Sequence, residues 1–253
     1  NVIGTMQLLA ACQKSPSVSK LVVKSSTSIY GAGPKDPAMF TEEMEPKHTP
    51  GSGWAKDSVE VESYVRGFAR RRPDVSVTTL RFANFLGPRV ETPMSSYFEL
   101  PVIPTLLGHD ARLQFIHEDD GLEALRQATI DEHPGMFNVA GDGIILLTQA
   151  ARRAGRPTIS LPASSAGLVG AIIRRLGLAD FSPEQVRFLT YGRGVDTTRM
   201  RTVFGFTPQH TTPETFDAFV RSRRLNRMLP PERVEAVEEQ LVSLLTGRGV
   251  VNG

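Results

Sequence analysis

The chain has 253 residues, of which 40% are hydrophobic and 22% are charged, and its formal net charge is +2. This composition is typical of one large globular domain or two small ones, and the small positive charge does not indicate nucleic-acid binding. No apolar run approaches the about 20 residues that span a bilayer, and no signal peptide is recognisable. Cys12 is the only cysteine, so we expect no internal disulfide and no metal site, and a reducing, cytoplasmic compartment fits.

The first 88 residues alternate between helical and strand-like patterns. Residues 1–13 are apolar nearly all round, which predicts a helix that is buried on more than one side. Residues 20–24 are a short β-branched run that stops at small hydroxyl residues, as buried parallel strands do. A second helix is predicted over residues 54–72 and a second strand over residues 75–82. This order predicts an α/β fold built around a parallel sheet.

The predicted helix over residues 54–72 has one continuous face and one charged pair. The face is formed by residues at helical spacing, namely Trp54, Ser58, Val61, Val65 and Phe68. Glu62 and Arg66 are four residues apart on another face and can form an ion pair. Pro73 is expected to end the helix.

The pattern changes after Pro88. Prolines interrupt residues 89–110, which we expect to be irregular, whereas residues 111–117 and 135–141 are strand-like. Four shorter helices are predicted to begin near Thr148, Ser182, Asp196 and Thr212. The one at Ser182 has a capping-box pattern. Residues 230–246 are predicted to form an amphipathic helix.

Six segments of the chain carry a resemblance to a known family. In chain order they read NVIGTMQLLAAC, KLVVKSSTSIYG, LRFANFLGP, QFIHEDD, FNVAGDG and DTTRMRTVFGFTP. Together they resemble the second half of an extended short-chain dehydrogenase/reductase of the NAD-dependent nucleotide-sugar epimerase/dehydratase group, which is typified by UDP-glucose 4-epimerase. The resemblance implies the second half of a Rossmann-like, doubly wound parallel sheet, with a smaller α+β substrate lobe.

The resemblance also predicts how the chain is divided. Residues 1–88 would form the C-terminal half of an NAD(P)-binding domain, and residues 89–224 would form mainly the substrate lobe. Within that lobe, residues 111–145 would partly return to the first domain, and residues 225–253 would be a helical extension. No glycine-rich phosphate loop follows a strand in this sequence, so we expect the part that carries it to lie before Asn1.

The resemblance assigns roles to residues at the ends of the two predicted strands. Ser26 occupies the family's catalytic Ser/Thr position, and Ser25 would lie beside the cofactor. Phe82 and Ala83 would contact the nicotinamide, and Asn84 would contact the nucleotide diphosphate. Plainer interpretations exist, because Ser26 can satisfy local backbone groups and Asn84 can stabilise a turn.

Three positions depart from the family pattern. Trp54 stands where the family has its general-base tyrosine, and Ser58 stands where it has its lysine. None of the four tyrosines is followed by a lysine four residues later, so no other register restores the pair. Losing general acid–base help costs about 10²–10⁴-fold in rate. Asp57 is the nearest ionisable substitute, although a first-turn acid is also favoured simply by the helix dipole.

The third departure affects substrate binding. Leu113 stands where sugar-nucleotide epimerases often carry a phosphate-binding arginine. The adjacent Arg112 does not replace it, because one step along a strand turns the side chain to the opposite face. We interpret the motif of His117 and residues 119–120 as mainly structural.

Two functional hypotheses follow. In the first, the protein is a divergent NAD- or NADP-dependent epimerase or dehydratase acting on a nucleotide sugar, with weak or lost standard activity and a base supplied from elsewhere. In the second, it is a non-catalytic NAD(P)- or nucleotide-sugar-binding sensor or scaffold subunit. The resemblance also implies a homodimer formed through the helices at residues 1–13 and 54–72. We expect no metal, no nucleic-acid partner and no membrane association.

Overall fold

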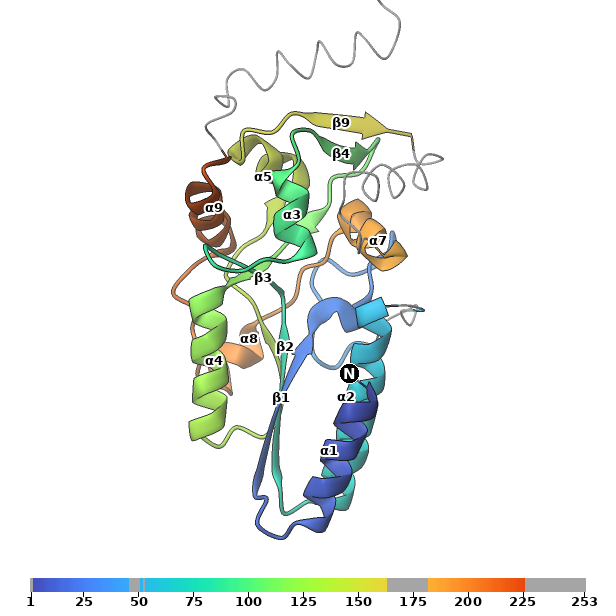
Figure 1. Ribbon diagram of the computed structural model, residues 1–253, viewed down its shortest axis with the longest axis vertical. Helices are drawn as coiled ribbons and strands as arrows, with labels where there is room; N and C mark the ends of the chain where they lie inside the picture. The colour runs from blue at the N-terminus through green and yellow to red at the C-terminus, as the bar shows by residue number, and fades with distance from the viewer. Residues whose placement is uncertain (1, 46–50, 52, 163–181, 226–253) are drawn as a thin grey trace, which may run out of the picture.

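The computed structural model describes residues 2–45, 51, 53–162 and 182–225. Its elements follow an α/β order (Figure 1). In chain order they are α1 (Val2–Lys14), β1 (Lys20–Ser26), the 3-10 helix η1 (Thr27–Tyr30), α2 (Gly53–Arg71), β2 (Ser76–Phe82), β3 (Asn84–Leu86), α3 (Pro93–Glu99), β4 (Ile103–Leu106), β5 (Arg112–Leu113), β6 (Phe115–His117), α4 (Glu118–Ile130), β7 (Gly135–Val139), β8 (Ile145–Leu146), α5 (Leu147–Arg153), β9 (Thr158–Leu161), α7 (Pro183–Tyr191), α8 (Thr198–Thr202) and α9 (Thr212–Arg223). The predicted α/β fold is confirmed.

A parallel sheet of order β1-β2-β7 forms the lower part of the molecule. Helices α1 and α2 cover one face, and α4 and α8 cover the other (Figure 1). Alternation along β1 explains this arrangement: Leu21 and Val23 pack with α1 and α2, whereas Val22 packs on the opposite side. The prediction of a short parallel strand between two helical layers is confirmed.

Helix α1 is less buried than its composition predicts. Only Leu9 is buried in it, while Ile3 and Leu8 are 72% and 57% exposed. The prediction of burial on more than one side is therefore wrong for the described chain. The physical reason is that α1 packs mainly along α2, and no other described element covers its outer side.

Helix α2 begins at Gly53, but its buried face differs from the predicted one. Ser58, Val65 and Phe68 are buried as expected, whereas Trp54 is 54% exposed. Glu62, which was predicted to lie on another face and to pair with Arg66, is buried as well. The buried face of α2 therefore includes Glu62, because Arg81 on β2 supplies a charged partner for its carboxylate.

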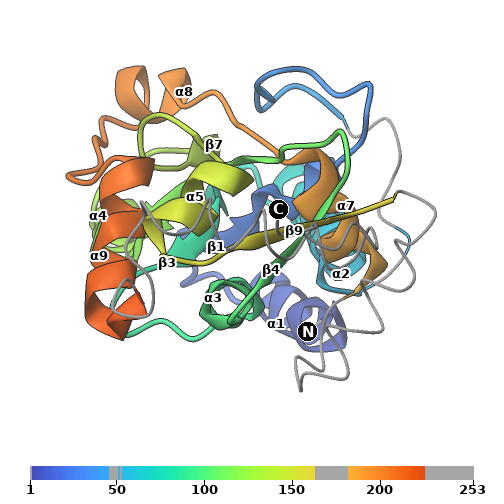
Figure 2. The same ribbon diagram turned by 90° about the horizontal axis from the view of Figure 1, so that it is seen from above.

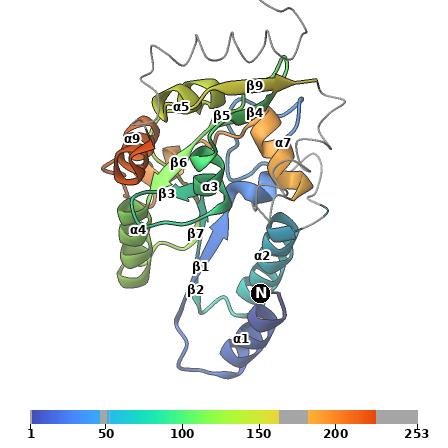
Figure 3. The same ribbon diagram turned by 45° about the horizontal axis from the view of Figure 1, so that its top comes forward.

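The upper part of the molecule is built from three short strand pairs. β3 and β6 are parallel, β4 and β9 are parallel, and β5 and β8 are antiparallel. Helices α3, α5, α7 and α9 surround them, and β4 and β9 cross the top side by side (Figures 2 and 3). A second core fills this part, centred on aromatic side chains such as Phe98, Phe115 and Phe216.

Several predicted boundaries need correction. Residues 89–110 are not irregular throughout, because they include α3 and β4. Thr92 caps α3 through the Ser95 backbone N–H, and Pro93 occupies the first turn, where its missing N–H is not needed. The strand-like stretch at 111–117 is split into β5 and β6.

The remaining helix starts agree closely with the sequence. Ser182 caps α7 with a capping box, as predicted, and Thr211 does the same for α9. Helix α5 begins at Leu147, and the Thr148 hydroxyl donates to Asp110 instead of capping the helix. The helix predicted at residues 230–246 lies outside the described residues. Within the described chain, no helix is both long and apolar enough to cross a membrane.

Candidate functional site

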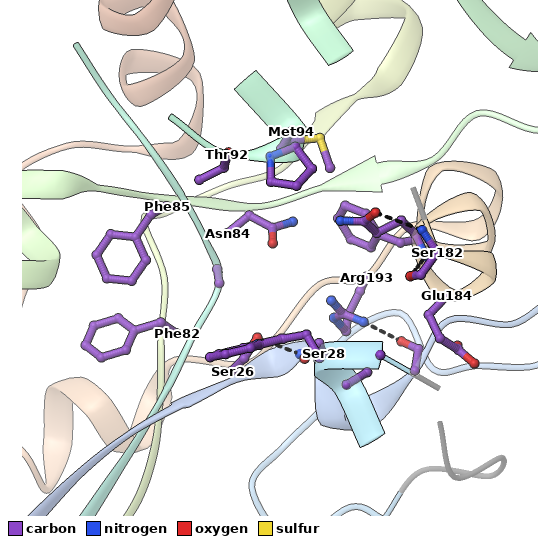
Figure 4. Close-up of a pocket in the computed structure, with 18 of the residues that line it drawn as sticks. Ser26, Ser28, Phe82, Asn84, Phe85, Thr92, Met94, Ser182, Glu184 and Arg193 are labelled. Carbon is purple, nitrogen blue, oxygen red and sulfur yellow. Dashed lines mark hydrogen bonds between the residues drawn. The ribbon is translucent and has the colours of Figure 1, made fainter. Parts of the chain in front are cut away.

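A pocket of about 730 Å³ opens where β1 and β2 end. Its wall is completed by the start of α2, by α3 and by α7, so both parts of the molecule contribute to it (Figure 4). The lining residues are Lys24, Ser25, Ser26, Ser28, Gly31, Gly53, Trp54, Ala55, Phe82, Ala83, Asn84, Phe85, Thr92, Pro93, Met94, Ser182, Glu184, Gln185, Phe188 and Arg193. The carboxyl ends of parallel strands are where open α/β sheets bind ligands.

Six of the residues that the resemblance places at the family's site line this pocket. Ser25 and Ser26 come from the end of β1, Phe82 and Ala83 from the end of β2, Asn84 from the start of β3, and Trp54 from α2. They meet because β1 and β2 run parallel in register, with Ser25 beside Arg81 and Ser26 beside Phe82. Their individual roles stay predictions.

Ser58 does not line the pocket. It is 8% exposed, and its hydroxyl donates to the Trp54 carbonyl oxygen at 2.8 Å, one helical turn back. A serine bonded in this way only satisfies the helix backbone. The side chain therefore offers no group to a molecule in the pocket.

Ser26 and Asn84 differ in whether their polar side-chain groups already have hydrogen-bond partners. The Ser26 hydroxyl caps η1 by accepting from the Ser28 N–H at 3.1 Å, which agrees with the plainer interpretation of this serine. The Asn84 amide forms no hydrogen bond with any residue that the structure describes, and it points toward the middle of the pocket (Figure 4). Its donor and its acceptor are therefore both free for a ligand.

Lys24 brings an amine to the edge of the pocket. Its Nζ lies 5.9 Å from the centre of the Trp54 ring and 5.2 Å from that of Phe85. Although much of the side chain is exposed, desolvation of the ammonium lowers the pKa of Lys24. Lys24 was not identified from the sequence; its position two residues before Ser26, on the same face of β1, was the available signal.

A buried charged network supports the floor of the pocket. Arg81 donates to both carboxylate oxygens of Glu62, at 3.0 and 2.7 Å, and both side chains are at most 4% exposed. Ser25 donates to Glu62 at 2.5 Å, and Arg81 also donates to the Tyr30 hydroxyl at 2.8 Å. Asn138 accepts from Tyr30 at 2.8 Å. The predicted Glu62–Arg66 pair is present, but it is longer, at 3.8 Å, and its Arg66 side chain is half exposed.

Burial of this network shifts its pKa values. Burial raises the pKa of Tyr30, although Arg81 opposes this shift. Burial alone would lower the pKa of Arg81, but the hydrogen bonds that Arg81 donates to Glu62 raise it overall. Arg81 is therefore held charged, and it fixes the end of β1 through Ser25.

Arg193 was also missed from the sequence. It lines the pocket between α7 and η1 and is 8% exposed, and its Nη1 donates to the Gly31 carbonyl oxygen at 2.6 Å. Burial lowers the pKa of Arg193 to about 10, which still leaves the guanidinium charged at neutral pH. Neither Leu113, which is fully buried in the upper core, nor Arg112, which donates to the Pro37 carbonyl oxygen, lines the pocket.

The motif around His117 lies outside the pocket lining. The His117 Nδ1 accepts from the Asp119 N–H at the start of α4. Asp120 accepts from the backbone N–H groups of Gln209 and His210, at 2.9 and 3.0 Å. These bonds join α4 to the segment before α9, in agreement with the structural interpretation of this motif.

Comparison with known proteins identifies the family. The model of the "NAD dependent epimerase/dehydratase family" matches residues 1–140, more than half of the chain. The chain belongs to the NAD-dependent epimerase/dehydratase family. The resemblance found in the six sequence segments is thereby confirmed.

Two curated proteins are similar to this family member along nearly all of this chain. The uncharacterized protein Rv0501 of Mycobacterium tuberculosis is 45% identical over 244 residues, which cover 96% of this chain and 65% of that protein. The uncharacterized protein y4nG of Sinorhizobium fredii is 25% identical over 259 residues, covering 96% of this chain and 64% of that protein. The chain thus spans slightly less than two thirds of the length of these relatives.

Solved structures confirm the Rossmann-like fold of this family member. MoeE5, in complex with UDP-glucuronic acid and NAD, superposes with a TM-score of 0.64 at 20% identity, covering 88% of this chain and 71% of that one. The dTDP-glucose 4,6-dehydratase of Bacillus anthracis, in complex with NAD, has a TM-score of 0.65 at 17% identity, covering 89% and 68%. A UDP-galactose 4-epimerase has a TM-score of 0.62 at 19% identity, covering 88% and 69%.

Proposed function

We propose that this family member binds a nucleotide sugar in the pocket, together with NAD or NADP, and that its standard epimerase or dehydratase activity is weak or lost. The observation that carries the proposal is the pair of residues at the start of α2. Trp54 stands in the pocket wall at the family's tyrosine position, and Ser58 stands outside the pocket at its lysine position.

The pocket lacks the usual means of proton transfer. A Trp indole has a donor N–H but no basic atom, and a Ser hydroxyl bonded to a helix carbonyl carries no charge. Among the described lining residues, the titratable side chains are Lys24, Glu184 and Arg193. None of these stands at the position of the family's general base, so general acid–base help of about 10²–10⁴-fold is lost unless another group supplies it.

Family membership supports a nicotinamide dinucleotide as the cofactor, and the described residues fit only part of it. Phe82 and Ala83 line the pocket beside Ser25, where the family resemblance implies the nicotinamide. Ser58 offers no ammonium group to the ribose that adjoins the nicotinamide. We therefore expect the nicotinamide end of the cofactor to bind weakly. We therefore assign no proton or hydride step to these residues.

The chain can also be an active but divergent enzyme, and Lys24 favours this alternative. Its amine lies beside Trp54 at the pocket edge, and its lowered pKa makes the neutral, basic form more accessible. In that case Lys24 would be the base and Ser26 would bind the reacting hydroxyl. A non-catalytic sensor or scaffold role would need neither residue.

A turnover assay separates these possibilities. With purified protein and added NAD, we expect interconversion of UDP-glucose and UDP-galactose to stay well below the about 1 per second at the low end of ordinary enzymes. If Lys24 is the base, residual turnover will rise with pH toward the lysine pKa and disappear in Lys24→Met. Turnover of several per second would contradict the proposal of weak or lost activity.

Restoring the missing pair is expected to strengthen cofactor binding. The double variant Trp54→Tyr, Ser58→Lys should bind NAD or NADP at least about tenfold more tightly, because a charged hydrogen bond contributes about 1.5–3 kcal/mol. Calorimetry measures the change. The matched control, Trp54→Tyr with Ser58→Met, adds similar length without the charge and should gain much less. An unchanged dissociation constant in a folded double variant would show that Trp54 and Ser58 do not occupy the family positions.

We further propose that the protein forms a homodimer through α1 and α2. The large apolar side chains left exposed on the two helices support this proposal, in particular Ile3, Met6, Leu8 and Tyr64. Sedimentation of the purified protein, compared with an Ile3→Glu, Leu8→Glu variant, tests it. A monomeric wild-type protein at micromolar concentration would contradict it.

A further inference from the structure

Two histidine rings stack on each other outside the pocket, where α4 meets the segment that leads into α9. His117 ends β6, and His210 stands two residues before α9. Their ring centres lie 4.0 Å apart, and their planes are inclined by 19°. His117 is 4% exposed, whereas the side chain of His210 is 35% exposed. The stack therefore places one buried and one partly exposed imidazole in direct contact.

The hydrogen bond at the start of α4 requires a neutral His117. The Nδ1 atom of His117 accepts from the Asp119 backbone N–H at 3.2 Å and caps the first turn of the helix. A ring nitrogen that accepts a hydrogen bond carries no proton, so the single proton of the neutral ring is on Nε2. Protonation of Nδ1 would bring two donors face to face. The capping bond therefore exists only while His117 is neutral.

His210 is held in a different way. Its Nδ1 lies 3.0 Å from the carboxylate of Asp120, which also accepts from the backbone N–H groups of Gln209 and His210. An ionised carboxylate only accepts, so Nδ1 of His210 carries a proton, and Nε2 can take a second one without loss of this bond. Once charged, His210 opposes protonation of the ring that is stacked on it.

The charges around His117 compete, and burial decides the balance. Burial lowers the pKa of His117 most, and His210 lowers it further. The carboxylates of Glu118, Asp119 and Asp120 act in the opposite direction, but the pKa of His117 stays below its ordinary value. The buried ring is therefore kept neutral to a lower pH than a histidine in water.

The carboxylates near His117 already have other partners. Arg89, from the segment after β3, pairs with both Glu118 and Asp119. The Asp119 carboxylate lies 3.7 Å from the His117 Nδ1, but it is 58% exposed, so water weakens its attraction for a charged ring. On α9, Glu214 belongs to the capping box of its own helix. These groups therefore compensate only part of the cost of charging His117.

This junction also supports a strand that reaches the pocket. β6 pairs with β3, so that His117 lies opposite Leu86 and Phe115 lies opposite Asn84. Asn84 lines the pocket, two residues along β3 from Leu86. A movement at the start of α4 can therefore be transmitted to the pocket through a short, continuous ladder of backbone hydrogen bonds.

We propose that His117 and His210 form a pH-sensitive latch, which holds α4 against the segment before α9 while His117 is neutral and releases it when both rings are charged. In the closed form, the Asp119 N–H is bonded to His117. In the open form, that N–H is released, and the new Nδ1 proton faces the Asp119 carboxylate instead. The latch needs no ligand, so the inference does not depend on the proposed function.

The direction of the pH dependence follows from the lowered pKa of His117. In the unfolded chain, a histidine binds its proton below about pH 6.5. The native protein keeps His117 neutral to a lower pH, so the unfolded state binds more protons within this interval. As the pH falls through it, the equilibrium constant of unfolding should rise by up to about tenfold for each pH unit. This contribution of His117 is absent at higher pH.

His117→Asn removes the titration but keeps the cap. An asparagine oxygen caps a helix well, and the side chain does not change charge. Urea denaturation of the purified protein, followed by circular dichroism between about pH 5 and 8, measures the effect. Between about pH 6.5 and 5.5, the unfolding constant of the wild type should rise at least about threefold more than that of His117→Asn.

His109→Asn is the matched control. His109 is exposed, and its ring contacts the edge of Tyr191, away from the stacked pair. Its replacement should leave the pH profile of the wild type unchanged. Identical profiles for the wild type and His117→Asn would overturn the latch.

His210→Asn tests the coupling between the rings and extends the test if His117→Asn does not fold. Without the neighbouring charge, the pKa of His117, measured by NMR titration of its ring, should rise. Amide hydrogen exchange at Asp119, corrected for its intrinsic pH dependence, should lose protection over the range in which His117 titrates. A pKa of His117 that His210→Asn leaves unchanged, or titration of His117 without loss of Asp119 protection, would overturn the latch.

Discussion

Replacing Arg81 by methionine is expected to lower the free energy of unfolding by about 3–5 kcal/mol. The change removes both donors to Glu62 and leaves that carboxylate buried at 3% exposure. It also removes the hydrogen bond to the Tyr30 hydroxyl. A buried carboxylate without its main cation is costly, because the half-exposed Arg66, at 3.8 Å, does not replace the two hydrogen bonds that Arg81 donates.

Arg66→Met is the matched control for this experiment. Arg66 approaches the same Glu62 at 3.8 Å, but its side chain is 48% exposed. We expect a cost below about 1 kcal/mol, as for other partly exposed pairs. Urea denaturation followed by circular dichroism measures both variants. Equal losses for Arg81→Met and Arg66→Met would contradict the assignment of Arg81 as the main partner of Glu62.

The Arg81 change should also affect the pocket. Ser25 donates to the same Glu62 oxygen that accepts from Arg81 Nε, so the network fixes the end of β1. Loosening it should weaken ligand binding even though Arg81 does not line the pocket. The Arg66→Met variant should keep the wild-type affinity.

Gly192→Ala is the second change with a large expected effect. Gly192 has a φ of +73°, and a Cβ built on it would lie 2.2 Å from the Arg112 nitrogen and 2.3 Å from the Arg112 oxygen. Positive φ alone costs an alanine about 1–2 kcal/mol. The clash with backbone atoms adds to this, because strand β5 cannot move without disturbing the upper core. We therefore expect a total loss of about 3 kcal/mol or more.

Gly108→Ala separates the cost of the positive φ from the cost of the steric clash. Gly108 has a similar φ of +78°, but nothing lies within 4 Å of the position of its Cβ. It should lose only the conformational part, about 1–2 kcal/mol. Because Arg193 follows Gly192 directly and lines the pocket, Gly192→Ala should also weaken ligand binding there, whereas Gly108→Ala should not. If the two variants lose similar amounts of unfolding free energy, β5 must shift to make room for the added methyl group at residue 192.

Local patterns predicted the elements of this fold well where the signal is short-range. The β-branched run of β1, the capping box at Ser182 and the proline that ends α2 each depend on neighbours along the chain. Helix α3 was missed although Thr92, Pro93 and Ser95 carry a capping signal of the same kind. The prolines of that segment suggested irregular chain, but Pro93 falls in the first helical turn, where proline is tolerated.

The sequence by itself determined the α/β class and the family, because these depend on residue type at known spacing. It also predicted that Trp54 and Ser58 stand at the family's tyrosine and lysine positions. Only the tertiary structure decided the charge pairs. Glu62 pairs mainly with Arg81 on β2 rather than with Arg66 on its own helix, and Arg193 reaches the pocket from a segment far along the chain. Such contacts arise when distant segments pack, and the low dielectric of the interior then makes a long-range pair far stronger than an exposed pair along a helix.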